Sequence, residues 1–280
     1  LVRSDNLNIA IDLMGYTGNN RYFIFRNRIA PIQINYLGFP GTMGSKFYDY
    51  IIGDKLIIPK KDERFYTEKV LRLKNYFPPN TCGAMISPEI SVSRKDFRIP
   101  DNAFIFACFN DNKKITPKEF DIWMNLLYEI KDSILWLSKS NNLSVINLRR
   151  AAEKRNINPD RIIFAERLKN KEEHLARYKI SDLGLDTFNY NGHTTTSDAL
   201  WTGLPVLTKT GKSFASRVAA SILNSFDLND LITSTEKEYE EKALYLAQNR
   251  DEILKFKIKL KTMNDEILLK SEIYAREIEN

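Results

Sequence analysis

The sequence predicts an α/β protein with a parallel β-sheet covered by helices on both faces, and three observations lead to this prediction. From Ala103 onward, short apolar runs alternate with helical segments of about a dozen residues, as in parallel sheets. A polar, glycine-containing turn at residues 191–195 leads from a strand-like run into a short helix. The 280-residue chain is 43% hydrophobic, which is ample for a packed core.

The first part of the chain contains short apolar runs that end at polar or glycine-rich turns. They predict strands at residues 8–13, 31–37, 48–54 and 69–73, with a helical piece at 21–28. The first of these runs fits a buried strand. Residues 75–101 contain several prolines (Pro78, Pro79, Pro88 and Pro100) and little periodicity, so we place a domain junction there. The predicted domains are residues 1–97 and 98–280.

The second part of the chain is more regular. Strands are predicted at residues 103–108, 133–137, 161–165, 181–186 and 205–208. Helices are predicted at residues 117–130, 143–155, 171–179, 214–226 and 239–248, and the charged segment 251–279 has the spacing of one more helix. Ligands of such sheets sit beyond the carboxyl ends of the strands. The polar loops considered below all lie at such ends.

The turn at residues 191–195 has the features of an anion site. The first N–H groups of a helix have no intrahelical partner, and the peptide dipoles add roughly half a positive charge there. A phosphate fits such a helix start. Thr194, Thr195 and Thr196 can donate to phosphate oxygens, and Asp198 can accept from sugar hydroxyls. A run of Thr at a helix start is equally consistent with simple N-capping, and this stretch alone leaves both interpretations open.

Few other residues are candidates for chemistry. The only two histidines, His174 and His193, both lie near strand ends in the same half of the sheet. Lys114 lies in the polar loop after the strand 103–108, where a lysine can neutralise a diphosphate as a point charge. The alternatives are structural histidines and an ordinary surface lysine. No P-loop, dinucleotide fingerprint, Asp-x-Asp pair or metal-ligand set is present, so amides, hydroxyls and Lys114 would have to balance any phosphate charge.

Composition narrows the function classes. The net charge of +6 and the pI of 9.1 permit phosphate binding. However, the densest basic cluster, Lys255–Lys261, reads as a solvated helix face, and no nucleic-acid motif is present. No apolar run approaches the about 20 residues of a membrane helix and no leader is visible, which predicts a cytoplasmic protein without membrane partners. Cys82 and Cys108 lack metal-ligand spacing and are predicted to be reduced thiols.

Four stretches of the chain resemble, in order, the protein O-linked N-acetylglucosamine transferases and their SPINDLY-like relatives. The stretches are residues 15–42, 109–117, 171–177, and 191–198 followed by 215–221. They span nearly the whole chain, and their combination is highly specific. The resemblance implies the GT-B architecture of two Rossmann-like domains, with an incomplete N-terminal domain in residues 1–97. Residues 98–280 would form the nucleotide-sugar domain with closing C-terminal helices.

The resemblance also implies roles for individual residues. Lys114 would bind the diphosphate and stabilise the departing UDP. Thr194 and Thr195 would hold the phosphates, and His193 would be a further donor-binding residue. The other contacts would be Lys171 and Asp198 at the ribose, His174 and Arg177 at the uracil, and Leu37, Gly38 and Pro40 along the sugar. Asp111 stands where the family often has a longer polar side chain, and its carboxylate would repel a diphosphate unless it turns away. No general base is identified.

The implied reaction is a metal-independent, inverting transfer of N-acetylglucosamine from UDP-N-acetylglucosamine to Ser or Thr hydroxyls of proteins. No cofactor beyond this donor substrate is expected. Helical tandem repeats that present protein acceptors are expected N-terminal to this region in the full-length protein. The alternatives are an O-fucosyltransferase that uses GDP-fucose, and a chain that binds a nucleotide sugar without turnover.

Overall fold

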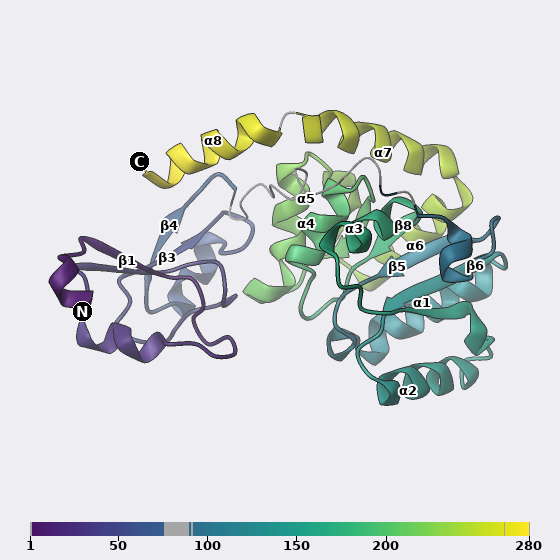
Figure 1. Cartoon of the computed structure of the whole chain (residues 1–280), viewed down its shortest axis with the longest axis horizontal. Coiled ribbons are helices and arrows are strands. Elements are labelled where there is room, and N and C mark those ends of the chain that lie inside the picture. Colours follow the sequence, from purple (N-terminus) through teal and green to yellow (C-terminus); the bar gives the residue numbers. More distant parts are fainter. Residues whose placement is uncertain (1, 76–89, 91, 266, 280) are drawn as a thin grey trace.

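The computed structural model describes residues 2–75, 90, 92–265 and 267–279, and these form two lobes around two parallel sheets (Figure 1). The smaller lobe contains the four-stranded sheet β1-β2-β3-β4, in which all neighbours pair in parallel. Its strands are β1 (Ile9–Asp12), β2 (Ile32–Asn35), β3 (Tyr50–Gly53) and β4 (Lys69–Arg72). The predicted helical piece at 21–28 is a 3-10 helix, Tyr22–Asn27.

The larger lobe contains a six-stranded parallel sheet in the order β10-β9-β8-β5-β6-β7. Its strands are β5 (Phe104–Cys108), β6 (Ser133–Ser138), β7 (Ile162–Ala165), β8 (Leu183–Leu185), β9 (Val206–Lys209) and β10 (Ile232–Thr233). The chain adds strands on one side of β5 and then, from β8, on the other. The carboxyl ends of β5 and β8 are therefore the topological switch point, where ligands of such sheets bind.

The helices agree closely with the sequence predictions. They are α1 (Pro117–Glu129), α2 (Asn142–Glu153), α3 (Lys171–Lys179), α4 (Thr194–Trp201), α5 (Val218–Ser225), α6 (Glu236–Gln248), α7 (Arg250–Asp265) and α8 (Ile267–Glu279). The predicted helix 214–226 begins as a 3-10 turn at Phe214–Ser216, and only α5 is α-helical. The predicted segment 251–279 comprises α7 and α8, and residue 266 between them lies outside the described residues.

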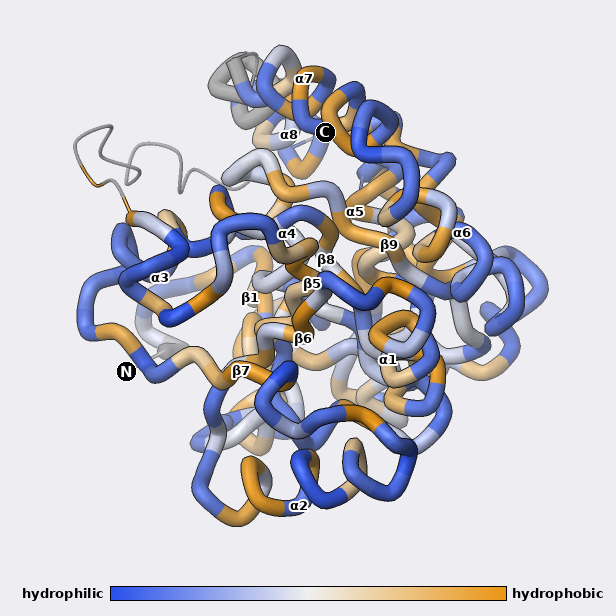
Figure 2. Tube along the Cα trace, turned by 90° about the vertical axis from the view of Figure 1, so that its right-hand side faces the viewer, coloured by the Kyte–Doolittle hydropathy of each residue, from blue (hydrophilic) through white to orange (hydrophobic). Residues whose placement is uncertain are grey.

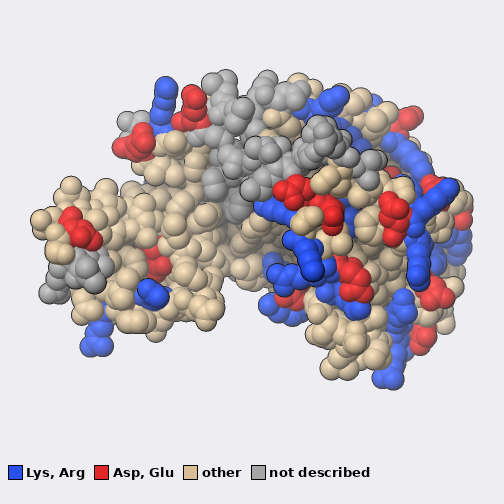
Figure 3. All heavy atoms as spheres, in the orientation of Figure 1, with Lys and Arg blue, Asp and Glu red and all other residues tan. Residues whose placement is uncertain are grey.

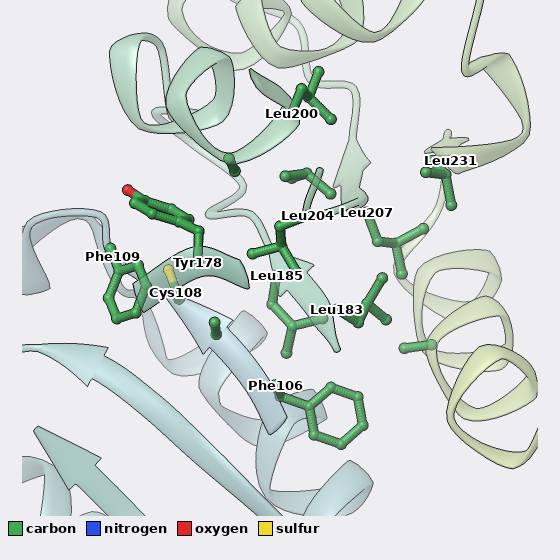
Figure 4. Close-up of a cluster of buried hydrophobic side chains, with 14 of the residues drawn as sticks. Phe106, Cys108, Phe109, Tyr178, Leu183, Leu185, Leu200, Leu204, Leu207 and Leu231 are labelled. Atoms are coloured by element: carbon green, nitrogen blue, oxygen red, sulfur yellow. The ribbon is translucent and has the colours of Figure 1, made fainter. Parts of the chain in front are cut away.

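The core of the larger lobe lies under the carboxyl ends of its central strands. Figure 4 shows Phe106 of β5, Leu183 and Leu185 of β8 and Leu200 of α4 in one buried apolar cluster. The central strands of this lobe are largely apolar, whereas α3 is mostly hydrophilic and α2 alternates between hydrophobic and hydrophilic residues (Figure 2). The loops of the switch point therefore follow strands whose side chains are packed in this core.

Strand β1 differs from its prediction as a buried strand. Its residues alternate, so that Ala10 and Asp12 are buried while Ile9 and Ile11 are 51% and 41% exposed. The strand is at the edge of its sheet. An apolar run predicts a strand but not the burial of both its faces, because burial depends on what packs against the sheet.

The two lobes share an interface with an apolar centre and a polar rim. Ile57 and Ile58, in the loop after β3, are fully buried in a core cluster that continues into the larger lobe. Arg217 forms an ion pair with Asp62 at 2.8 Å, and Ser221 of α5 donates a hydrogen bond to Asp54. The polar contacts fix the position of the loop after β3 against α5.

Helix α8 returns to the smaller lobe, where it contacts residues that follow β2 and β4. Its Tyr274 contacts Tyr36, which follows β2, and its Glu277 accepts a hydrogen bond from the backbone of Lys74.

The prolines at 78, 79 and 88, on which the predicted junction partly rests, lie outside the described residues, as does Cys82. Cys108 is a buried free thiol on β5.

The basic cluster on α7 is only partly a solvated face. Lys257 donates to the carbonyl of Ser181 at 2.7 Å, and Lys259 pairs with Asp227 at 2.8 Å. Acidic and basic side chains are intermixed on the face of the larger lobe in Figure 3.

None of the helices that the structure describes combines the length and the apolar character needed to cross a membrane.

Candidate functional site

The candidate site lies at the switch point, where polar residues follow β5 and β8. Asn110 comes two residues after β5, and Asp186 directly follows β8. The Asn110 amide donates to Asp186 Oδ1 at 3.1 Å and to the hydroxyl of Thr187 at 2.9 Å. These bonds join the two loops at the carboxyl ends of the central strands.

The turn that follows, residues 190–195, is held by several hydrogen bonds. Gly192 N–H donates to Asp186 Oδ1 at 2.7 Å, and the Asn191 side chain donates to the carbonyl of Thr187 at 2.8 Å. The Asn191 N–H donates to the carbonyl of Ala215 at 2.9 Å. The turn is consequently fixed from two sides before α4 begins.

The start of α4 is not capped by side chains, which contradicts the N-capping interpretation of the Thr run. His193 occupies the N-cap position without a capping hydrogen bond. The Thr196 hydroxyl donates to the carbonyl of Gly192 at 2.9 Å, and the Thr195 hydroxyl donates to Asn110 Oδ1 at 2.5 Å. Because these hydroxyls are used elsewhere, none of the side-chain hydrogen bonds among the described residues caps the first amides of α4, and a helix start of this kind suits an anion.

Lys114 places a positive charge at the same turn. It ends a 3-10 helix (Asn112–Lys114) in the loop after β5 and donates from Nζ to the carbonyl of Asn191 at 2.9 Å. Its ammonium also lies 4.1 Å from the centroid of the Tyr190 ring. Burial lowers the pKa of Lys114, and the negative charge of Asp186 opposes that shift. The ammonium and the helix start thus favour an anion in one place.

His193 contributes a polar atom without a partner. Its ring stacks on Tyr190 with a centroid distance of 5.0 Å. Burial, followed by the charge of Lys114, lowers the pKa of His193 to about 4, so that the ring is neutral at pH 7. Its buried Nε2 has no hydrogen-bond partner in the part of the chain that the structure describes. Such an atom is a candidate ligand contact.

An open cavity of about 1020 Å³ adjoins the loop after β5. Three of the predicted site residues, Lys171, His174 and Arg177, line this cavity from α3. Phe109 and Asp111 line it from the end of β5. The cavity therefore joins the residues predicted for the uracil end to Asp111, whereas Lys114, His193, Thr194 and Asp198 are not among the described residues that line it.

His174 and Arg177 are linked to each other within the cavity wall. The Arg177 guanidinium contacts His174 Nδ1 and donates to the carbonyl of Glu166 at 2.7 Å. Since arginine can only donate, His174 Nδ1 accepts, which assigns the ring proton to Nε2. Burial and the charges of Arg177 and Lys171 lower the pKa of His174 to about 4. A neutral imidazole is therefore held in one orientation.

Asp111 is engaged with its own loop. It accepts a hydrogen bond from the backbone of Lys113 at 3.1 Å, pairs with Lys113 Nζ at 3.0 Å and accepts from the Ser140 hydroxyl at 3.3 Å. Burial raises the pKa of Asp111, but the bonds and charge of Lys113 lower it overall. The Asp111 carboxylate is therefore directed toward Lys113 and Ser140.

The remaining predicted residues occupy two places. Asp198 is 5% exposed in α4, and its charge acts on Tyr178 of α3. Leu37, Gly38 and Pro40 lie in the other lobe, in the loop after β2. Leu37 has a φ of +71°, and a Cβ on Gly38 would lie 2.1 Å from the carbonyl oxygen of Leu13. This loop packs too tightly on the turn after β1 to accept a side chain at residue 38.

Three residues of the site, Asn110, Asp186 and Tyr190, were not among those predicted from the sequence. For the first two, a usable signal was their position after buried strands that meet at the switch point. The signal for Tyr190 was weaker, because a tyrosine in a turn is common and its contact with Lys114 depends on the fold. No group of three or more potential metal-ligating side chains occurs among the described residues.

The chain is similar to known proteins in both sequence and structure. The Glycosyl transferase family 41 profile matches residues 1–80 and 78–278. The chain is 36% identical over 258 residues to the probable UDP-N-acetylglucosamine--peptide N-acetylglucosaminyltransferase SEC of Arabidopsis thaliana, over 90% of this chain and 26% of that protein. It is 29% identical over 271 residues to the protein of the same description named SPINDLY from Petunia hybrida, over 94% of this chain and 28% of that protein.

The structural comparison agrees with the sequence comparison. A mutant of the Thermobaculum terrenum O-GlcNAc transferase superposes with a TM-score of 0.89 at 29% identity, over 99% of this chain and 52% of that chain. Anabaena HepE in complex with UDP and glucose superposes with a TM-score of 0.65 at 12% identity, over 99% of this chain and 80% of that one, and shows the fold alone. The fold is GT-B, with two parallel α/β sheets. The chain spans about a quarter of the length of the curated relatives that it matches.

Proposed function

Because the chain belongs to glycosyl transferase family 41, we propose that it binds UDP-N-acetylglucosamine and transfers N-acetylglucosamine to Ser or Thr hydroxyls of proteins. The observation that carries this proposal is the contact of the Lys114 ammonium with the turn before α4, at a helix start whose N-cap residue, His193, makes no side-chain capping bond. A diphosphate placed there would meet both positive elements at once. The names of the relatives support the choice of sugar and acceptor.

The proposed reaction is an inverting displacement. The oxygen of the acceptor hydroxyl attacks the anomeric carbon and gives up its proton to the departing diphosphate or to water. The bond from that carbon to the β-phosphate oxygen breaks, and UDP departs. Negative charge grows on the departing diphosphate, and donors already in place stabilise it without reorganisation. Lys114 and the first amides of α4 would supply this stabilisation without a metal ion. Since the Thr195 hydroxyl already donates to Asn110, we assign the phosphate contact at Thr195 to its backbone amide.

The other donor contacts follow the shape of the site. His174 and Arg177 would hold the uracil in the cavity beside α3, which Lys171 also lines. Lys171 with Asp198 would contact the ribose. The neutral His174 ring suits an uncharged base better than an imidazolium would. The loop at Leu37, Gly38 and Pro40 would form the wall for the sugar from the other lobe.

Nucleotide binding tests this proposal directly. We expect UDP to bind the 280-residue chain in the presence of EDTA, at least about tenfold more tightly than GDP, because a tenfold ratio requires only about 1.4 kcal/mol of base-specific contact. Isothermal titration calorimetry measures both affinities. His174→Ala should bring the UDP and GDP affinities together, whereas the exposed Lys113→Ala should preserve their ratio. Preference for GDP, or binding only with added metal, would contradict the proposed donor.

Turnover is a separate measurement. Transfer of labelled N-acetylglucosamine from its UDP donor to acceptor protein is expected. UDP binding without any transfer would instead support a nucleotide-sugar-binding role for this region.

A further inference from the structure

Asp186 is the most connected polar group beneath the candidate site. Its carboxylate accepts from four donors: Gly192 N–H at 2.7 Å, Thr187 N–H at 2.9 Å, the Asn110 amide at 3.1 Å and the Thr208 hydroxyl at 2.7 Å. The residue is only 2% exposed. Because so little of the carboxylate is exposed, its effects on a ligand are expected to pass through these partners and through its charge.

Two of the partners lead to the phosphate end of the site. Gly192 is the residue before His193, and its N–H bond to Asp186 sets the path of the turn into α4. Asn110 accepts from the Thr195 hydroxyl while it donates to Asp186. A single carboxylate thus holds the backbone on one side of the helix start and, through Asn110, a side chain of its first turn.

The same carboxylate balances the charge of Lys114. Lys114 donates to the carbonyl of Asn191, next to Gly192, and is partly desolvated. Among the charged groups that act on it, Asp186 has the largest effect in favour of the ammonium. Cys108 supplies no charge at pH 7, because burial raises its pKa to about 12. The charged or titratable groups facing Lys114 are Asp186, Cys108, Asp111, Lys113, Tyr190 and His193.

We propose that Asp186 is a positioning residue of the donor site, which orients the turn before α4 through Gly192 and Asn110 and keeps Lys114 positively charged. This inference rests on the proposed function for its effect on UDP, but its effect on the turn does not depend on any ligand. A carboxylate is suited to both tasks, because it offers only acceptors to four donors and carries the countercharge. Its own pKa, raised by burial to about 6, leaves it ionised at pH 7.5.

The ligand-free test is hydrogen–deuterium exchange of the whole chain. In Asp186→Ala, the amides of residues 190–196 should exchange at least about tenfold faster than in the wild type, because the lost acceptor leaves Gly192 and Asn110 without their partner. The matched control is Asp182→Ala, at the other end of β8, where the carboxylate pairs with Arg94 at 3.1 Å. Unchanged exchange at the turn, or equal acceleration in the control, would overturn the proposal.

The ligand-dependent test is UDP affinity between pH 7.5 and pH 9.5. Asp186→Ala should weaken UDP binding by about tenfold or more. Asp186→Asn keeps an acceptor for Gly192 and Asn110 and should restore most of the affinity at pH 7.5. Because the countercharge is gone, however, the alkaline loss of UDP affinity should begin at a lower pH than in the wild type.

A double variant shows whether this pH effect passes through Lys114. In a Lys114→Met background, Asp186→Asn should cause no additional alkaline loss, because the titrating ammonium has been removed. An alkaline limb identical in the wild type and in Asp186→Asn would contradict the countercharge role. If the wild type bound GDP rather than UDP, the proposed donor would be wrong, and the same comparisons with GDP would still decide the role of Asp186.

Discussion

Lys114→Met is expected to lower kcat for glycosyl transfer by about 100- to 1000-fold, the usual loss when one preorganised donor to a developing negative charge is removed. The ammonium lies at the turn before α4, where its donation to the carbonyl of Asn191 fixes its position. Methionine has a similar length but neither charge nor donor. The diphosphate would then rely on the helix start alone as it departs. Labelled-sugar transfer under saturating donor measures the effect.

The neighbouring lysine is a matched control for this variant. Lys113 has the same charge one residue away, but its side chain is 79% exposed and pairs with Asp111. Exposed ion pairs contribute about 0 to 1 kcal/mol, so Lys113→Met should change kcat by less than about fivefold. Equal losses in the two variants would show that Lys114 acts only through the general charge of the loop.

Gly192→Ala should reduce UDP affinity at least about tenfold and destabilise the fold by about 1 to 3 kcal/mol, the range for overpacking at a tight position. A Cβ at residue 192 would lie 2.5 Å from Thr196 Oγ1, 2.6 Å from Thr195 Oγ1 and 2.9 Å from Asn110 Oδ1. Both hydroxyls belong to stiff β-branched side chains that are hydrogen-bonded in place, so the turn itself must move. Calorimetry with UDP and thermal unfolding measure the two effects.

Gly18 provides the comparison for this substitution. A Cβ at that position has no heavy atom within 4 Å. Gly18→Ala should therefore leave the affinity for UDP unchanged and alter the unfolding temperature little. If Gly192→Ala bound UDP as tightly as Gly18→Ala, the close packing of the turn would have no part in phosphate binding.

Periodicity was sufficient to predict most elements of the larger lobe. Helix α3 was predicted with the bounds it has, residues 171–179, and the unit of strand, turn, helix and strand around α4 is present as predicted. The prediction failed where burial depends on distant parts of the chain. The apolar run of β1 looked like a buried strand, but nothing local to that run specifies what packs on its outer face, and Ile9 is 51% exposed.

The sequence was sufficient to predict which loops lie next to each other at the candidate site. Lys114 and the turn at Asn191 follow strands that end at the same sheet edge, so their contact follows from the fold class. The hydrogen-bond partner of each threonine hydroxyl was not predictable from the sequence. Whether the Thr195 hydroxyl caps α4 or donates to Asn110 depends on ångström-scale geometry between residues 85 positions apart in the chain. The assigned contacts of individual residues with a donor remain predictions.

The return of α8 to the smaller lobe has a consequence for how the protein is made. Residues that complete the smaller lobe are far away along the chain: Asp62 and Arg217 are 155 positions apart, and Tyr36 and Tyr274 are 238 apart. A ribosome that adds about 5 to 20 residues per second releases the partners of Asp62 and Ile57 on the order of ten seconds later. During that interval strands β1 to β4 lack these contacts, so the interface between the two lobes forms only after α5 has been synthesised.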